Sequence, residues 1–388
     1  MLKASTLRGL RPEDELLLAL ARLRLTTEEK DRIRSFLAAH EGKLDWGRFI
    51  DQAARHMVLP IVGRNLSRNR LTHAADGRPL MPYRWIYADV YEANRLRTAL
   101  LTDEYGKVLR GLNDAGLPYL IRKGPVLGEH VYLDPAARRV SNLDVFLRRD
   151  DFAVYADVAA ELGYDVGAPS VNGQRITPFD RRTELYFKTV VTNSSLPFMK
   201  VGNSSLVDMY ILTGISSLFQ PTTGLTNDVE ELLDRSLPTT LYGVPARMLD
   251  RVDQILDACV QVHVRATMLY YIESGKDLTL RNFLDLIAVL ESRPDDFVEE
   301  FEERVRRFDC ADSVYYSLHH AGLLYPAFVP EDLVERFRPT KLDYLDEYGG
   351  FDGGCYRWQK PFAKRLFDTR RAAEVTARSA VPGPRSVV

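Results

Sequence analysis

The chain has few cysteines, little net charge and no long apolar run. Its 388 residues include three cysteines, Cys259, Cys310 and Cys355, which are far apart and form no Cys-x-x-Cys pair. Such spacing favours neither a disulfide framework nor a zinc site and is typical of a reducing compartment. A formal net charge of −2 gives no overall attraction to nucleic acid or to an anionic membrane. Apolar runs stay shorter than a membrane span, so we expect a cytoplasmic protein without a membrane or nucleic-acid partner.

Two motifs of catalytic loops are also missing. The sequence contains no Gly-x-Ser-x-Gly, which argues against the nucleophile elbow of α/β-hydrolases. The Gly-rich stretch at 349–354 lacks the preceding strand and following helix that a phosphate-binding loop needs. A hydrophobic fraction of 45% over this length is nevertheless enough to bury more than one core. We therefore expect two or three domains, with the functional residues in motifs other than these two.

The order of apolar patterns divides the chain into four regions. Residues 1–115 show helical spacing, 116–215 alternate short strands with helices, 216–340 are again helical, and 341–388 form an extension whose end we expect to be disordered. We predict an α+β fold in which a small mixed sheet is flanked by N- and C-terminal helical bundles. We place the ligand cleft between the sheet and the C-terminal helices.

The middle region supplies the segments that can carry a site. Runs of β-branched, aromatic and aliphatic residues between turn residues predict strands at 117–121, 140–147, 183–191 and 204–212. The second strand contains Asn142 and Asp144. Residues two apart on a strand point the same way, so this amide and this carboxylate share one face, while Leu143 and Val145 share the other.

The order of these pieces resembles that of a known superfamily. A strand is followed by Lys-Gly opening a helix, then by a strand with polar residues two apart, a helix ending in Leu-Gly-Tyr, and a later strand with another acid. The matching positions are Lys123-Gly124, Arg139, Ser141-Asn142-Leu143-Asp144, Leu162-Gly163-Tyr164 and Asp208-Met209-Tyr210. This pattern resembles the DNA-polymerase-beta-like nucleotidyltransferases and, more narrowly, the bacterial uncharacterised nucleotidyltransferase family found beside natural-product biosynthesis genes. The resemblance covers most of residues 15 to 330.

The resemblance implies a nucleotidyltransferase core and metal-dependent transfer of a nucleotidyl group, with AMP expected, to a small molecule or peptide in natural-product biosynthesis. Mg²⁺ would be the cofactor, and ATP or another nucleoside triphosphate the donor. The implied metal ligands are Asp144, Asp208 and Asn142, and the implied nucleotide-binding residues are Lys123, Gly124, Ser141 and Arg139.

Two positions depart from the family pattern. Asn142 stands where the family has an acid, and Tyr210 stands where it has a histidine. An amide keeps one oxygen ligand but loses the charge, which suits Mg²⁺ poorly. We expect Glu184, on the predicted strand 183–191, to compensate as a further catalytic acid. The alternative is a degenerate nucleotidyltransferase fold that binds a pathway intermediate or partner protein, or that catalyses a nucleotide-independent reaction.

Each of these residues also has a structural interpretation. Asn142 and Asp144 can be the polar rim of an edge strand, and Asp208 a buried acid paired with an arginine. Lys123 can be a solvated residue of a turn, and Glu184 an exposed strand residue.

Two other polar pairs are assigned no chemistry. Arg281 and Asp285 are four apart and are expected to brace a helix. Cys259 and His263 have the same spacing and are expected in the core.

Overall fold

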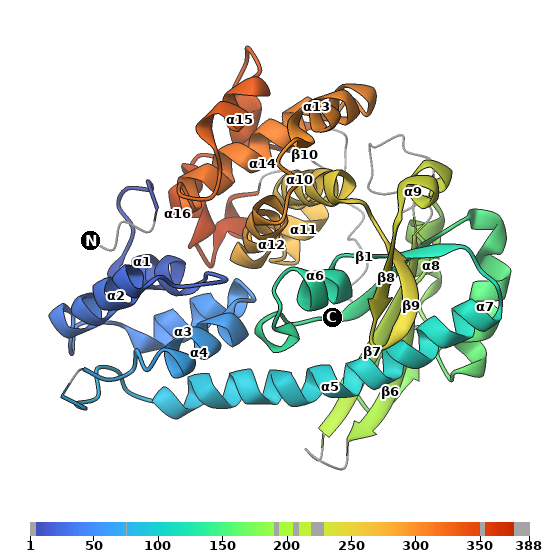
Figure 1. The fold of residues 1–388 in the computed structure, drawn as a ribbon, viewed down its shortest axis with the longest axis horizontal. Helices are drawn as coiled ribbons and strands as arrows, with labels where there is room; N and C mark the ends of the chain where they lie inside the picture. The colour runs from blue at the N-terminus through green and yellow to red at the C-terminus, as the bar shows by residue number, and fades with distance from the viewer. Residues whose placement is uncertain are drawn as a thin grey trace.

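The computed structural model describes residues 5–74, 76–189, 194–204, 209–218, 229–349 and 354–375. They form a mixed sheet surrounded by many helices, so the predicted α+β fold is confirmed. In Figure 1 the N-terminal helices lie on one side, the sheet on the other, and the C-terminal helices above. None of the helices in these ranges is both long and apolar enough to cross a membrane.

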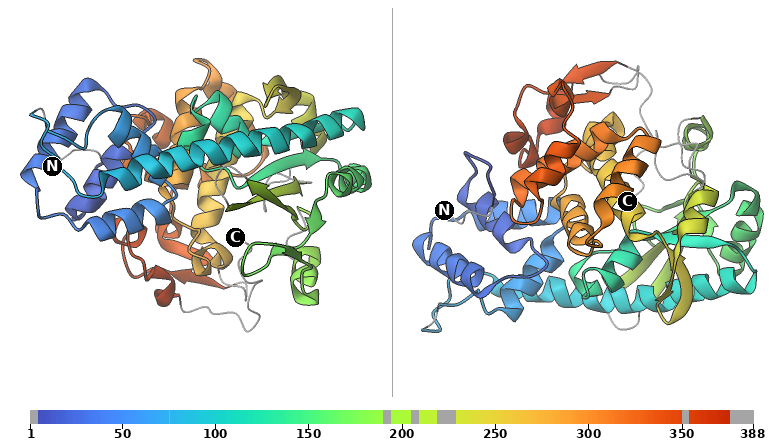
Figure 2. Two further views of the ribbon diagram at one scale, coloured as in Figure 1. Left: turned by 90° about the horizontal axis from the view of Figure 1, so that it is seen from below. Right: turned by 45° about the horizontal axis from the view of Figure 1, so that its top comes forward.

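Five helices make up the N-terminal region. They are α1 (Pro12–Leu20), α2 (Thr27–Ala39), α3 (Trp46–Arg55), α4 (Leu59–Arg68) and α5 (Arg84–Asp114). α2 begins with a capping box, in which Thr26 and Glu29 each accept a hydrogen bond from the backbone N–H of the other. α5 has 31 residues and is about 47 Å long. It runs along both the helical region and the sheet (Figures 1 and 2) and so joins them.

Seven strands form the main sheet in the order β3-β6-β7-β2-β1-β9-β8. Their bounds are β1 (Tyr119–Arg122), β2 (Asn142–Leu147), β3 (Asp165–Val166), β6 (Phe198–Ser204), β7 (Met209–Leu218), β8 (Leu237–Leu241) and β9 (Val244–Met248). A separate hairpin contains β4 (Ala168–Pro169) and β5 (Ile176–Thr177). β2 lies at the centre, antiparallel to β1 and parallel to β7.

The two faces of the sheet are covered differently. α5 and α7 (Phe152–Glu161) pack on one face, in a core that contains Leu143 and Val145 of β2. α9 (Val229–Arg235) packs on the other face, beside Phe146. Because side chains alternate along a strand, Asn142 and Asp144 lie on the Phe146 side, away from α5.

Three segments differ from the prediction. The single strand expected at 204–212 is wrong, because β6 ends at Ser204 and β7 begins at Met209. Residues 183–191 were expected as a strand, but α8 (Arg181–Thr189) occupies most of this stretch. The Asp180 carboxylate accepts the N–H of Thr183 at 2.7 Å and caps the helix, and Tyr186 packs on Tyr270 one turn later. Residues 237–248, placed with the C-terminal helices, form β8 and β9 and extend the sheet, with every second residue of β9 buried.

The C-terminal region is helical, as predicted. It contains α10 (Arg251–Thr267), α11 (Leu269–Glu273), α12 (Leu280–Glu291), α13 (Phe297–Arg307), α14 (Ala311–Leu324) and α15 (Glu331–Arg336). A short hairpin, β10 (Glu347–Gly349) and β11 (Cys355–Arg357), and α16 (Phe362–Leu366) follow. The expected disordered end, residues 376–388, lies outside the described residues.

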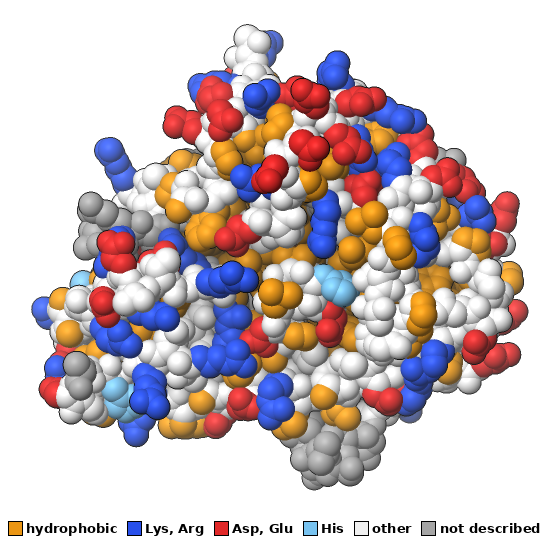
Figure 3. All heavy atoms as spheres, viewed as in Figure 1, with side chains coloured by type: hydrophobic (Ala, Val, Ile, Leu, Met, Phe, Trp, Pro, Cys, Tyr) orange, Lys and Arg blue, Asp and Glu red, His pale blue; other side chains and the backbone are white. Residues whose placement is uncertain are grey.

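The N- and C-terminal helices share one core rather than forming separate bundles. Buried residues of α1 to α4, of α10 and of α12 to α16 belong to a single apolar cluster, and the backbone N–H of Thr6 donates to the Leu323 carbonyl at 2.9 Å. On the face shown in Figure 3, cationic and anionic side chains are interspersed, which agrees with the small net charge.

Candidate functional site

The polar pair on β2 is brought together as predicted. Asn142 and Asp144 are both half-buried, and the Asn142 amide nitrogen donates a hydrogen bond to the Asp144 carboxylate. The Ser141 hydroxyl donates to the other end of the same amide, its oxygen, at 3.0 Å. The amide therefore lies between a hydroxyl and a carboxylate on one edge of the central strand.

The neighbouring strands place different residues beside this pair. Asn142 lies opposite Gly214 of β7, and Asp144 lies opposite Arg122 of β1. A Cβ on Gly214 would lie only 3.1 Å from the Met199 Sδ but in ordinary contact, at 3.5 Å, with the Asn142 Cβ, so the glycine makes room chiefly for Met199. Tyr210 is in β7, opposite Asn203 of β6.

Two predicted acids are not joined to the pair by any described contact. Asp208 lies outside the described residues. Glu184 is half-buried on α8, and not on a strand beside β2 as expected, so the sequence-based reason for choosing it no longer holds.

The turn after β1 has an unusual backbone. Lys123 has φ +54° and ψ −115°, and α6 (Gly124–His130) begins directly after it. A Cβ on Gly124 would lie 3.1 Å from an Arg138 guanidinium nitrogen, which explains the need for glycine at this close approach. A non-glycine residue with positive φ costs of order 1–3 kcal/mol and is often found at functional sites.

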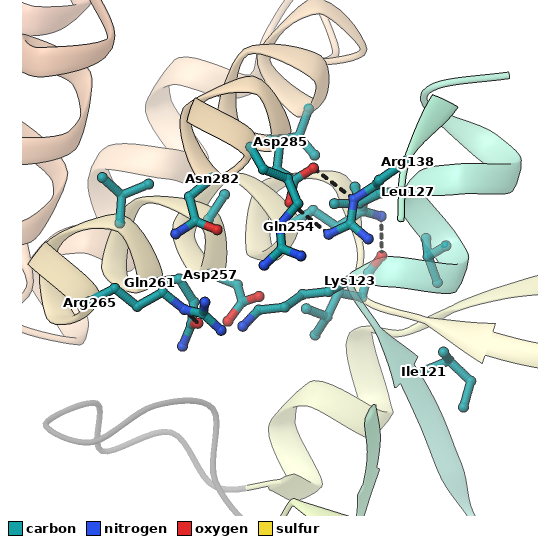
Figure 4. A pocket seen from close by; sticks show the side chains of 16 residues that line it. Ile121, Lys123, Leu127, Arg138, Gln254, Asp257, Gln261, Arg265, Asn282 and Asp285 are labelled. Carbon is teal, nitrogen blue, oxygen red and sulfur yellow. Dashed lines mark hydrogen bonds and ion pairs between the residues drawn. The ribbon is translucent and has the colours of Figure 1, made fainter. Parts of the chain in front are cut away.

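Lys123 lines a cavity between the sheet and the C-terminal helices (Figure 4). The space, counted together with the solvent at its mouth, is about 600 Å³. Its apolar lining comes from Ile121, Val126, Leu127, Leu249, Ala258, Val262 and Val289, and its polar lining from Lys123, Arg138, Gln254, Asp257, Gln261, Arg265, Arg281, Asn282 and Asp285. A partly apolar cavity with converging polar groups is the usual form of a small-molecule site, and it lies where the sequence placed the ligand cleft.

Two buried ion pairs fasten the sheet side of the cavity to the helices. Arg122 donates from Nε to both carboxylate oxygens of Asp257 on α10, at 2.9 and 2.8 Å. Arg138 donates from Nε and Nη2 to the two oxygens of Asp285 on α12, at 2.8 and 2.7 Å, and the Tyr132 hydroxyl donates to the same carboxylate at 2.9 Å. Burial raises the pKa of Asp285, but Arg138 outweighs it and the pKa lies below its usual value. Both acids of the cavity are therefore paired with an arginine of the sheet side.

Two basic side chains of the cavity, Lys123 and Arg281, have lowered pKa values. Burial, and then the neighbouring Arg122, hold the pKa of the Lys123 ammonium well below its usual range, although Asp257 and Asp144 oppose this. Burial, followed by Arg138, lowers the pKa of Arg281 to about 9. The charge of Lys123 thus interacts both with Asp257 of the cavity and with Asp144 of β2.

The sequence analysis found part of this site. Of the predicted phosphate neighbours, Lys123 lines the cavity and Gly124 does not. Arg139 and Ser141 are exposed and do not line it either, whereas Arg138 does. The expected Arg281–Asp285 brace is not formed, because Asp285 binds Arg138 and Tyr132 instead. The missed residues of α10 had a readable signal: polar side chains recur on one face of an apolar helix at intervals of three and four, namely at Gln254, Asp257, Gln261 and Arg265.

Few of the side chains that the structure describes could bind Mg²⁺ at the β2 pair. Among the residues that the structure describes, no group of three or more His, Cys, Asp or Glu side chains is placed to hold a metal ion. Asp144 supplies one carboxylate, and Asn142 can supply its amide oxygen if the amide turns. Mg²⁺ is commonly held by one or two carboxylates, with substrate phosphates and water completing the shell. The pair therefore fits one such ion, and a second ion would require further ligands.

A family model described as uncharacterised nucleotidyltransferase matches residues 42–326, which is well over half of the chain. The chain therefore belongs to the uncharacterised nucleotidyltransferase family. No curated protein and no solved structure matches it.

Proposed function

We propose that the chain transfers a nucleotidyl group, AMP from ATP, to a small molecule or peptide of a specialised biosynthetic pathway. The observation that carries the proposal is the position of the Asn142–Asp144 pair: Asp144 lies opposite Arg122 at the end of β1, and the next residue, Lys123, lines a cavity that also contains Arg265 and Arg281. A polyphosphate donor needs charge neutralisation by metal ions and cations, and this edge of the sheet offers both kinds of partner. Membership of the family supports the same reaction class.

In the proposed reaction, an acceptor hydroxyl or amine forms a bond to the α-phosphorus of the donor. The bond from that phosphorus to the bridging oxygen breaks, pyrophosphate leaves, and the acceptor proton passes to water. Asp144 and Asn142 would hold one Mg²⁺, which supplies neutralisation of the phosphate charge. Asp208 stays a proposed third ligand, and Gly124, Ser141 and Arg139 stay proposed phosphate neighbours.

One observation favours the second candidate, a nucleotidyltransferase fold used only for binding. The Asn142 amide donates to Asp144, and so occupies the carboxylate that the metal would need. A family acid at position 142 could not make this contact, since an ionised carboxylate is only an acceptor. In this alternative, the cavity holds a pathway intermediate or a partner's side chain and catalyses no nucleotide chemistry.

Calorimetry with ATP, CTP, GTP and UTP, with and without Mg²⁺, separates the two candidates. The transferase predicts Mg²⁺-dependent binding of at least one nucleotide, weakened about tenfold or more by Asp144→Asn, since hydrogen bonds and contacts to a charged group are worth about 1.5–3 kcal/mol. The matched control is Asp157→Asn, an exposed acid of α7. The proposal fails if none of the four nucleotides binds with the metal present.

The variant Asn142→Asp tests the weakened ligand directly. It restores the family acid, so we expect tighter Mg²⁺-dependent nucleotide binding and faster pyrophosphate release in the presence of the acceptor. Without Mg²⁺, the same variant should be less stable than the natural chain, because two carboxylates then face each other on β2. An unchanged response to Mg²⁺ would show that the pair holds no metal.

A further inference from the structure

We propose that the cavity between α6, α10 and α12 is a binding site for a phosphate-type oxyanion, held by Lys123, Arg265 and Arg281. The proposal rests on the proposed function for the role of the ligand, but its physical basis is independent. The start of α6, α10 and α12 each contribute one basic side chain to the same small space. Figure 4 shows the Lys123 side chain reaching from the start of α6 toward Asp257, with Arg265 on the opposite side.

The acids of the cavity do not balance these cations. Asp257 is engaged by Arg122, and Asp285 by Arg138. Within the described part of the chain, no carboxylate lies within ion-pair distance of Lys123, Arg265 or Arg281. Three basic side chains therefore face one cavity without an acidic partner after the two ion pairs are formed.

Two contacts hold the Arg265 side chain in place. Its Nε donates to the Gln261 side-chain oxygen at 3.3 Å, and its guanidinium lies over the Tyr271 ring, 5.2 Å from the centroid. These contacts fix one edge of the guanidinium and leave its terminal nitrogens for a ligand. A planar guanidinium held in this way suits the paired oxygens of a phosphate group.

Buried polar atoms in the same cavity also lack partners. Among the described residues, Arg281 Nε, Asn282 Nδ2 and Gln254 Oε1 are buried and make no hydrogen bond. Gln254 is only 7% exposed, and its amide orientation is fixed because Nε2 donates to the Leu249 carbonyl at 2.8 Å. Buried polar groups are nearly always satisfied, so these three atoms indicate a ligand or ordered water. The two nitrogens donate to an oxyanion, and the Gln254 oxygen can accept the remaining proton of a hydrogen phosphate.

The electrostatics of the empty cavity support this. Burial, followed by Arg122 and Arg265, depresses the pKa of Lys123, while the two acids that face it, Asp257 and Asp144, oppose this depression. An anion in the cavity would oppose that depression. Binding is therefore expected to be accompanied by proton uptake, which a passive surface contact would not produce.

The oxyanion can come from either of two sources with the same chemistry. One is the polyphosphate end of the nucleotide donor, which would extend from the β2 pair past Lys123 into the cavity. The other is a phosphate group carried by the acceptor. In both cases, the site explains why the C-terminal helices are fastened to the sheet at this point.

The test is calorimetry on the full chain with pyrophosphate as the probe, in two buffers of different ionisation enthalpy. We expect saturable binding with proton uptake, weakened about tenfold or more by Arg265→Gln and by Arg281→Gln. The control is Arg306→Gln, which changes an exposed arginine of α13 outside the cavity. This variant should bind pyrophosphate as tightly as the natural chain. Arg281→Gln should not lower the melting temperature of the empty protein, because it removes a buried cation that lacks an ion pair.

The competition of ATP with pyrophosphate separates the sources. Displacement assigns the cavity to the donor tail, and simultaneous binding assigns it to the acceptor. The proposal is overturned if pyrophosphate does not bind, or if it binds the two cavity variants as tightly as it binds the control. Neither result depends on Asp144 or Mg²⁺, so loss of this site and loss of nucleotidyl transfer are distinguishable.

Discussion

Asp285→Asn should be among the most damaging conservative substitutions in the chain. Asp285 accepts two hydrogen bonds from Arg138 and one from Tyr132, and this group joins the start of β2 to α12. The substitution keeps the shape but removes the charge, so the buried Arg138 loses its counter-ion. Breaking a buried ion pair from one side costs about 3–5 kcal/mol, which is a large part of the stability of most domains.

Urea denaturation followed by tryptophan fluorescence would measure this cost. Tyr132→Phe should cost less, about 1.5–3 kcal/mol, since it removes one hydrogen bond to the same carboxylate and no charge. The double variant Arg138→Met with Asp285→Leu should recover much of the loss, because it leaves no unpaired charge. A loss below about 1 kcal/mol for Asp285→Asn would refute the view that this pair fastens the sheet to α12.

Two further predictions concern stability. His56 is buried, and burial, followed by Arg371, lowers its pKa from 6.5 to about 3. Since the unfolded chain alone binds this proton, stability should fall by up to about 1.4 kcal/mol per pH unit as the pH drops from 6.5 toward 3, and urea titrations of His56→Gln should show a flatter pH dependence. Gly63→Ala should cost about 1–3 kcal/mol, because a Cβ would lie 2.1 Å from the Tyr87 carbonyl oxygen. Gly322→Ala, with 3.9 Å to Val329, is the control, and equal melting temperatures for the two variants would contradict the packing of α4 on α5.

Local patterns predicted the elements whose own residues determine them. β2 was predicted because Leu143 and Val145 alternate with Asn142 and Asp144, and burial follows that alternation. α8 was missed because its Tyr, Phe and Thr residues favour a strand by propensity, while the cap from Asp180 and the contact with Tyr270 decide for a helix.

The cavity could be predicted only in part, for a different reason. Its ion pairs join residues far apart in sequence: Arg122 and Asp257 are separated by 135 positions, and Arg138 and Asp285 by 147. No periodicity within one helix reveals such a partner. The spacing of Arg281 and Asp285 predicted an ion pair within α12. Instead, the buried Asp285 carboxylate accepts two hydrogen bonds from Arg138, which is distant in sequence.

The charge of the cavity follows from the way the sheet is joined to the helices. Each of the two ion pairs joins an arginine of the sheet side to an acid of a C-terminal helix. Asp257 of α10 and Asp285 of α12 are therefore already paired. The remaining cations, Lys123, Arg265 and Arg281, cannot be neutralised by the same acids. Their desolvation opposes folding, because a buried charge without a partner is costly. A chain that keeps three such cations around one cavity is best explained by an anionic ligand that neutralises them when it binds.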